Sequence, residues 1–233
     1  MPARLPLLHG LNPEELLLLR ERATEFLAGK VIAPSDGFEL SGEQRLEIAT
    51  WASLPVLHRG IGAYDGFHGV IVYPEEFLAP REEVDEAGVV HIGHEEVSGE
   101  SWDAGPILLS WADVEASREP GQGSVVIHEC VHKLDMGDGE MNGVPALEGS
   151  GITYGEWAEA MREAWEAMGR EEAEEGETLL DDYALESPAE FFAVFSEEFF
   201  TAPELLLESA PRVYALLARY YGVDPLRWWG GID

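Results

Sequence analysis

The sequence is poor in lysine, in cysteine and in long apolar runs, and each shortage argues against a class of protein. Only Lys30 and Lys133 are lysines, and 14 basic residues stand against 46 acidic ones among 233. Nucleic acids are bound through clustered Lys and Arg, so direct nucleic-acid binding is not expected. Cys130 is the single cysteine, which excludes an internal disulfide.

Signals for membranes and for secretion are also missing. No run of 18 or more apolar residues, about the length needed to span a bilayer, occurs in the sequence. Residues 1–10 lack the basic-then-apolar pattern of a signal peptide. Together with the single cysteine, these observations predict a cytoplasmic protein with no membrane partner.

The formal net charge of −32 is spread along the chain rather than confined to a tail. Such an excess destabilises the folded state by self-repulsion at low ionic strength, and counter-ions screen that repulsion. An ordinary acidic protein accounts for this composition, and so does adaptation to a salt-rich cytoplasm, as in a halophile. The second interpretation predicts a melting temperature that rises between low and molar salt.

Caps, prolines and glycines divide the chain into helices and short strands. Helices are predicted at residues 13–28, 41–53, 111–119, 124–136, 156–168, 188–200, 203–209 and 211–221, and strands at 70–73, 89–97 and 105–110. Residues 81–86 read as a charged turn, and the acidic run 170–177 as a solvated helix end or a loop. The last strand is apolar throughout, so we expect it to be buried on both faces.

The length suits one domain spanning residues 1–233. Residues 1–60 form a helical N-terminal part, and residues 61–233 supply the strands and the remaining helices. His91 and His94 fall in the strand predicted at 89–97. Residues three apart on a strand face opposite sides, so we interpret both as surface histidines rather than metal ligands.

The helix at 124–136 carries the motif H-E-x-x-H, at His128, Glu129 and His132. Positions four apart lie on one helix face, so both imidazoles can share a metal ion. Glu129 is one step round the helix, where it can reach a water in the metal's open position and act as a general base. The alternative is a core helix whose two histidines merely hydrogen-bond to backbone.

Two other residues of this helix, Cys130 and Asp135, also have possible functional roles. A thiol at Cys130 could be a ligand or a redox switch, but it should point away from the metal face, so we interpret it as a buried packing residue. Asp135 lies three residues beyond His132 and is a candidate acceptor for a ligand imidazole. A helix-end carboxylate paired with Lys133 or with solvent is the equal alternative.

A catalytic zinc usually takes three protein ligands, so two histidines leave one to be found. The stretch Ser187-Pro188-Ala189-Glu190 has the pattern of a capping box, which by itself explains Glu190. The helix that follows is so rich in phenylalanine that it must be buried, and a buried glutamate needs a partner. Glu190 is therefore the leading candidate. Glu197 lies on nearly the same face and is its rival, and Glu186 and Glu198 are weaker choices.

Several stretches, in the same order, resemble the Mlc titration factor A family of zinc peptidases. They are LPVL (54–57), VIVYPEEF (70–77), GESWDAGP (99–106), LSWADV (109–114), VVIHECVHKLD (125–135), NGVP (142–145) and YALESPAEFFAVFSEEFF (183–200). The likeness covers most of the chain. Cys130 and Val131 depart from it, because the family commonly has an aromatic residue and alanine there.

The resemblance implies an α+β fold: a mainly helical zincin-like metallopeptidase domain with a small mixed β-sheet beside the H-E-x-x-H helix. It implies a gluzincin-type site, related to the catalytic domain of anthrax lethal factor. One catalytic zinc ion would be bound by His128, His132 and Glu190. Glu129 would be the general base, and Tyr183 would assist the oxyanion. The substrate would be a peptide or protein, with aminopeptidase-like action as one option.

A second function fits the same resemblance. Relatives in the family are linked to sequestering the Mlc glucose repressor, so the protein could instead bind a transcriptional repressor, with catalysis latent or secondary. Glu129 favours a working enzyme, because a pure binding module would not need it. A structural zinc site is disfavoured, because such sites usually have four protein ligands. In an enzyme, the strand at 105–110 could receive an extended peptide by β-addition, although the open edge is not evident from the sequence.

Overall fold

The computed structural model describes residues 5–35, 37–84, 90–97, 99–101, 105–119, 121–176 and 178–229. For residues 77–84, 90–97 and 99–101 the description is of the backbone alone. Within these ranges no helix combines the length and the apolar character needed to cross a membrane.

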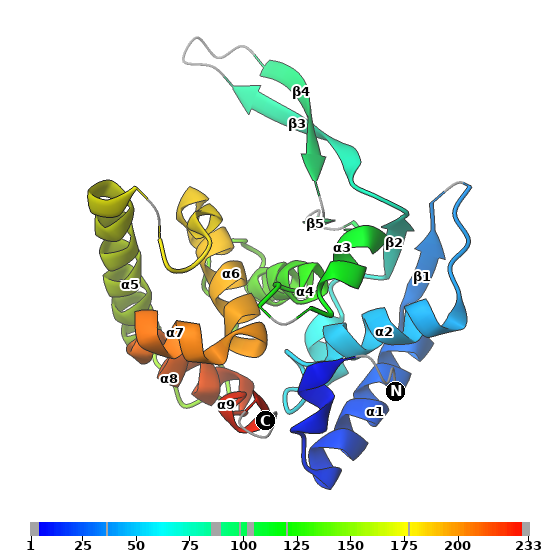
Figure 1. Ribbon diagram of the computed structural model, residues 1–233, viewed down its shortest axis with the longest axis horizontal. Helices are drawn as coiled ribbons and strands as arrows, with labels where there is room; N and C mark the ends of the chain where they lie inside the picture. Colours follow the sequence, from blue (N-terminus) through cyan, green and yellow to red (C-terminus); the bar gives the residue numbers. More distant parts are fainter. Residues whose placement is uncertain are drawn as a thin grey trace.

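Two capped helices open the fold. Helix α1 (Pro13–Gly29) begins at Asn12 and α2 (Gly42–Ser53) begins at Ser41, and both starts are complete capping boxes. In each, the cap side chain accepts a backbone N–H, and the side chain three residues on bonds back to the cap's own N–H. Both helices were predicted from these caps and are confirmed. They pack against each other beside the sheet (Figure 1).

A small mixed sheet has the strand order β1-β2-β6-β5. Strands β1 (Val31–Pro34), β2 (Gly69–Tyr73) and β6 (Ile107–Ser110) are parallel, and β5 (Gly99–Ser101) pairs with β6 in the antiparallel sense. Every residue of β6 is buried, as its apolar run predicted. Because β6 lies between β2 and β5, it cannot receive an extended peptide, and that expectation was wrong. Strands β1 and β5 were not predicted.

Strands β3 (Phe77–Val84) and β4 (Val90–Val97) form an antiparallel hairpin that projects from the body (Figure 1). The prediction of a charged turn at 81–86 was wrong up to residue 84, because Arg81 pairs with Gly93 and Val84 with Val90. The ladder between the two strands satisfies the backbone whatever the side chains are, so charged residues do not prevent pairing here. The side chains of His91 and His94 lie outside the described part.

The other regular elements are helices and short 3₁₀ turns. They are α3 (Trp111–Ala116), α4 (Val125–Asp135), α5 (Tyr154–Glu175), α6 (Pro188–Thr201), α7 (Pro203–Ser209), α8 (Pro211–Tyr221) and α9 (Leu226–Trp229), with short 3₁₀ turns η1 (Pro6–His9), η2 (Ile61–Tyr64), η3 (Met136–Asp138) and η4 (Asp182–Glu186). Helix α3 is shorter than predicted. Helix α5 continues to Glu175, so most of the acidic run is helical rather than a loop.

Helix α4 lies at the centre of the molecule, between the sheet with α1 and α2 on one side and α5 to α9 on the other (Figure 1). Nine of its eleven residues are buried. The five apolar ones, Val126, Ile127, Cys130, Val131 and Leu134, belong to a core cluster that extends from Leu5 to Trp228. Cys130 is buried there, and burial raises the pKa of its thiol to about 12, so the prediction of a packing residue is confirmed. This is the mainly helical α+β architecture that the resemblance implied.

Candidate metal centre

The two motif histidines come from the interior of α4. The helix begins at Ser124, whose hydroxyl accepts the backbone N–H of Ile127. His128 and His132 therefore stand one turn apart in regular helix, and their Nε2 atoms face each other at 3.2 Å. His132 is only 5% exposed. Helix geometry brings the two Nε2 atoms together, and burial restrains the ring of His132.

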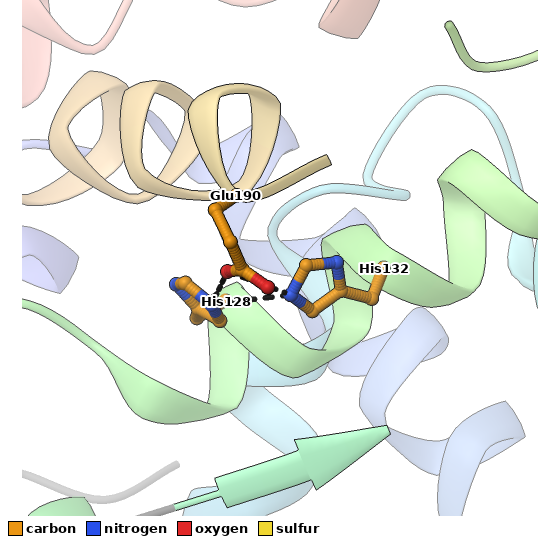
Figure 2. A group of neighbouring side chains, drawn as sticks. All are labelled: His128, His132 and Glu190. Atoms are coloured by element: carbon orange, nitrogen blue, oxygen red, sulfur yellow. Dashed lines mark hydrogen bonds and ion pairs between the residues drawn. The ribbon is translucent and has the colours of Figure 1, made fainter. Parts of the chain in front are cut away.

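Glu190 reaches that point from the first turn of α6 (Figure 2). Its Oε2 lies 3.0 Å from Nε2 of His128 and 3.3 Å from Nε2 of His132. The hydroxyl of Ser187 accepts the backbone N–H of Glu190, which is half of a capping box. In the described structure the carboxylate turns to the histidines and does not complete the box. The explanation of Glu190 by capping alone was therefore wrong.

Three donor atoms, one each from His128, His132 and Glu190, lie within 4.8 Å of one another. It is the only such group of three His, Cys, Asp or Glu residues in the part of the chain that is described. Imidazole nitrogens and a carboxylate oxygen are common ligands of divalent transition metals. Two imidazole nitrogens 3.2 Å apart need a proton or a cation between them, so the residues fit a metal ion.

Glu197, the rival ligand, lies on the other side of one imidazole. Its Oε2 is 3.1 Å from Nδ1 of His128, the ring nitrogen that points away from the three-atom group. The seven-residue spacing from Glu190 correctly indicated a shared helix face, but the side chain meets the histidine rather than the donor group. Glu186 and Glu198 are outside the group as well.

The charges of the site are set by these contacts. Burial alone would lower the pKa of His128, but its hydrogen bonds with Glu190 and Glu197 outweigh burial and raise that pKa well above the ordinary value. Burial would likewise raise the pKa of Glu190, yet the two histidines hold it well below its usual range. The metal-free centre thus keeps an ionised carboxylate beside a protonated imidazole. A metal ion binding there would displace that proton.

Glu129 is buried beside the three-atom group. Its side chain is 4% exposed, and its Oε2 has no hydrogen-bond partner among the described residues. Burial raises the pKa of this carboxyl, while the nearby His128 and His132 act to lower it. Its carboxylate therefore holds a proton more readily than one in water.

Tyr183 lies on the same side of the molecule as His128. It belongs to η4, whose start is capped by Asp181 accepting the backbone N–H of Tyr183 at 3.0 Å. The ring centroids of Tyr183 and His128 are 6.1 Å apart. Because η4 packs on α6, Tyr183 and Glu190 approach His128 from adjoining segments.

Asp135 does not orient a ligand imidazole. It is fully buried, and its Oδ2 accepts the backbone N–H of Gly143 at 2.7 Å. The buried Nδ1 of His132 finds no hydrogen-bond partner in the described ranges, so the predicted pairing with Asp135 is not formed. Burial also rules out the alternative in which Asp135 pairs with solvent.

Gly143 connects the end of α4 with the start of α6. Besides the bond to Asp135, its carbonyl accepts the indole N–H of Trp157 at 2.8 Å. Its φ is +78°, and an added Cβ would overlap the carbonyl oxygen of Pro188 and lie 2.7 Å from the carbonyl carbon. We call this arrangement of Asp135, Gly143 and Pro188 the α4–α6 bracket. In the sequence, Gly143 was noted only as part of the stretch NGVP (142–145).

Comparison with known proteins agrees with the geometry. A family model described as glucose-regulated metallo-peptidase M90 matches residues 1–222. Mlc titration factor A of Pectobacterium atrosepticum is 42% identical over 225 residues, which cover 95% of this chain and 84% of that protein. The proteins of that name from Escherichia fergusonii and Edwardsiella ictaluri are each 40% identical, covering 95% and 96% of this chain and 84% and 86% of their own. The chain therefore belongs to the glucose-regulated metallo-peptidase M90 family.

Proposed function

We propose that the protein is a zinc-dependent peptidase whose centre is formed by His128, His132 and Glu190. The observation that carries this proposal is the buried carboxylate oxygen of Glu129 that has no hydrogen-bond partner among the described residues. Leaving such a group buried and unsatisfied costs about 1–3 kcal/mol or more. A catalytic base next to a metal centre explains why the fold carries that cost.

His128 and His132 would hold one zinc ion through their Nε2 atoms, and Glu190 through its carboxylate. Three protein ligands with a position left over are typical of catalytic zinc rather than structural zinc. When bound, the ion supplies Lewis acidity, which lowers the pKa of a water towards about 7 and polarises a carbonyl group.

The chain's own residues would then move the protons. Glu129 takes a proton from the attacking water and later delivers it to the leaving amine, a step for which a carboxyl with a raised pKa is suited. Tyr183, beside His128, donates its phenolic hydrogen to the oxyanion that forms from the scissile carbonyl. The competing role for Tyr183 is packing at the start of α6.

The peptide would bind along β5. This strand contacts α4, and in the described sheet it has β6 on one side only. An extended peptide can pair with such an outer strand through main-chain hydrogen bonds. Binding there would bring a scissile bond to α4. How far the bound peptide extends along β5 would then decide between removal of terminal residues and internal cleavage.

The test compares wild-type protein with Glu129→Gln on a mixed peptide library, in high salt and at matched zinc occupancy. We expect fragments from the wild type and a loss of about 10²–10⁴-fold in rate for the variant, because general-base catalysis contributes that much. The positions of the cuts distinguish aminopeptidase from endopeptidase action. Zinc bound with no cleavage by either protein would contradict the proposal.

The second candidate is binding of a transcriptional repressor. The observation in its favour is that relatives covering almost this whole chain carry the name Mlc titration factor A. Its test is the affinity of a purified repressor of the Mlc type for wild type and for Glu129→Gln. Equal binding by both, with no cleavage of the library, would favour a regulatory binding protein over the peptidase.

The setting we propose is a salt-rich cytoplasm. Lys133 is buried and Lys30 is half-buried, and their Nζ atoms lie 5.7 Å and 4.3 Å from the ring centroid of Phe67. The outer surface is therefore left to arginine and to the acidic excess. A melting temperature that does not rise between low and molar salt would contradict this setting.

A further inference from the structure

We propose that Glu197 is a positioning residue, which holds the imidazole of His128 through Nδ1 and thereby strengthens zinc binding at the centre. The inference rests on the proposed function in taking zinc as the bound ion. Its test measures zinc binding directly, so that it does not depend on peptide cleavage.

Two carboxylates on one face of α6 contact the two ring nitrogens of His128. Glu190 lies 3.0 Å from Nε2 of His128, and Glu197, two turns later on the helix, lies 3.1 Å from Nδ1. An ionised carboxylate only accepts hydrogen bonds, so Nδ1 must carry the proton that Glu197 receives. Nε2 is then the nitrogen that a metal ion would bind, once the ion has displaced the other proton of the protonated ring.

The carboxylate of Glu197 is itself confined. A Cβ added at Gly123 would overlap its Oε1 and lie 2.8 Å from its Cδ. The φ of Gly123 is not positive, so its backbone conformation does not by itself require glycine. Glycine matters here because a side chain would occupy the place of the Glu197 carboxylate. Since Gly123 immediately precedes the cap of α4, the backbone entering the metal helix forms one wall of the place where Glu197 lies.

The two motif histidines differ in what surrounds their Nδ1 atoms, as His132 shows. Its Nδ1 is buried with no hydrogen-bond partner in the described residues, so this ring is held by packing and by the contact of its Nε2 with Glu190. Partners of the non-ligating nitrogen fix the tautomer and direction of a ligand imidazole, and their loss typically weakens metal binding about 10–100-fold. Within the described structure, Glu197 is the carboxylate that contacts the non-ligating nitrogen, Nδ1, of His128.

The experiment compares zinc dissociation constants, obtained by competition with a chelator, for Glu197→Met, Glu197→Gln and Gly123→Ala. We expect Glu197→Met to weaken binding about 10–100-fold. The glutamine variant should lose less, because its amide oxygen can still accept from Nδ1. Gly123→Ala should also weaken binding, although it leaves every ligand and Glu197 itself in the chain.

Matched controls are available nearby. Glu198→Gln removes the neighbouring carboxylate from the same helix, and Gly155→Ala adds a Cβ where nothing lies within 4 Å. Both should keep the wild-type zinc affinity. In the zinc-loaded wild type and in Glu197→Gln, the His128 Nδ1–H proton should give a slowly exchanging NMR signal, and Glu197→Met should lose it.

Unchanged zinc affinity in Glu197→Met and in Gly123→Ala would overturn the inference, and so would a retained Nδ1–H signal in Glu197→Met. If the methionine variant does not fold, the glutamine and alanine variants decide alone. A wild type that binds zinc but cleaves no peptide defeats only the proposed peptidase activity. A wild type that does not bind zinc defeats both proposals.

Discussion

Helices α4 and α6 build the centre in different ways. The donor atoms of α4 come from the interior of a buried helix, where one turn separates His128 from His132. The donor of α6 comes from its first turn, at the end of a longer side chain, and its distance from α4 depends on what joins the two helices. Local helix geometry therefore fixes one half of the site, and tertiary contacts fix the other. The α6 half should be the one that single substitutions displace.

The largest effect should follow removal of the α6 ligand. Glu190→Gln keeps the side-chain shape but loses the charge, so we expect zinc affinity to fall by more than the about 10–100-fold typical of a residue that merely supports a ligand. Glu186→Gln removes an exposed carboxylate from the turn just before and should change nothing. Chelator competition measures both. Similar affinities for the two variants would mean that α4 binds the ion without α6.

The segment before α6 is tested by Tyr183→Phe. Loss of one oxyanion donor typically costs about 10²–10³-fold in kcat, and zinc affinity should stay unchanged because the phenol is not in the donor group. Tyr154→Phe, at an exposed position, is the control. A Tyr183→Phe variant with wild-type kcat would leave Tyr183 with only its packing role.

The α4–α6 bracket is tested by a pair of glycines. Gly143→Ala forces a positive φ on alanine and also drives its Cβ into Pro188, so we expect the free energy of unfolding to fall by about 2–4 kcal/mol. Gly149 has a similar φ of +80° with nothing within 4 Å, so Gly149→Ala should cost only about 1 kcal/mol. Urea unfolding of the metal-free proteins measures the difference. Equal losses would show that the two helix ends are not held together at Gly143.

The same division explains what the sequence could predict. His128, Glu129 and His132 were identified by spacing alone, because helix periodicity is a local property. The residues alone favoured Glu190 over Glu197 without deciding between them, because a carboxylate three residues after Ser187 can either complete a cap or reach across to α4. Only the position of α4 decides between them.

Contacts between segments distant in the chain could not be predicted from the sequence for the same reason. The sequence gives no reason to single out Gly123 or Gly143, because their importance lies in contacts with backbone or side chains more than 40 residues away. Strands β1 and β5 are too short to show a period, and the charged residues of β3 resemble a turn until a partner strand is present. Helices α1, α2, α4 and α6, in contrast, were predicted to within one residue of their ends.

The smallest predicted effect concerns Glu198, which α6 carries next to Glu197. Burial, together with the charges of Glu197 and Asp181, raises the pKa of Glu198 from 4.5 to about 7. The folded state thus favours the protonated form. This contribution to stability is complete below pH 4.5 and is lost as the pH rises through 7, by at most about 3 kcal/mol.

Glu198→Gln keeps the side chain neutral at every pH, so it should remove this loss. We expect the metal-free variant to be more stable than wild type by about 1–3 kcal/mol at pH 8.5, with the difference shrinking towards zero as the pH falls to 5. Urea unfolding at a series of pH values measures it. A difference independent of pH would mean that Glu198 is ionised in the fold over this whole pH range, so that α6 carries adjacent charged carboxylates at Glu197 and Glu198.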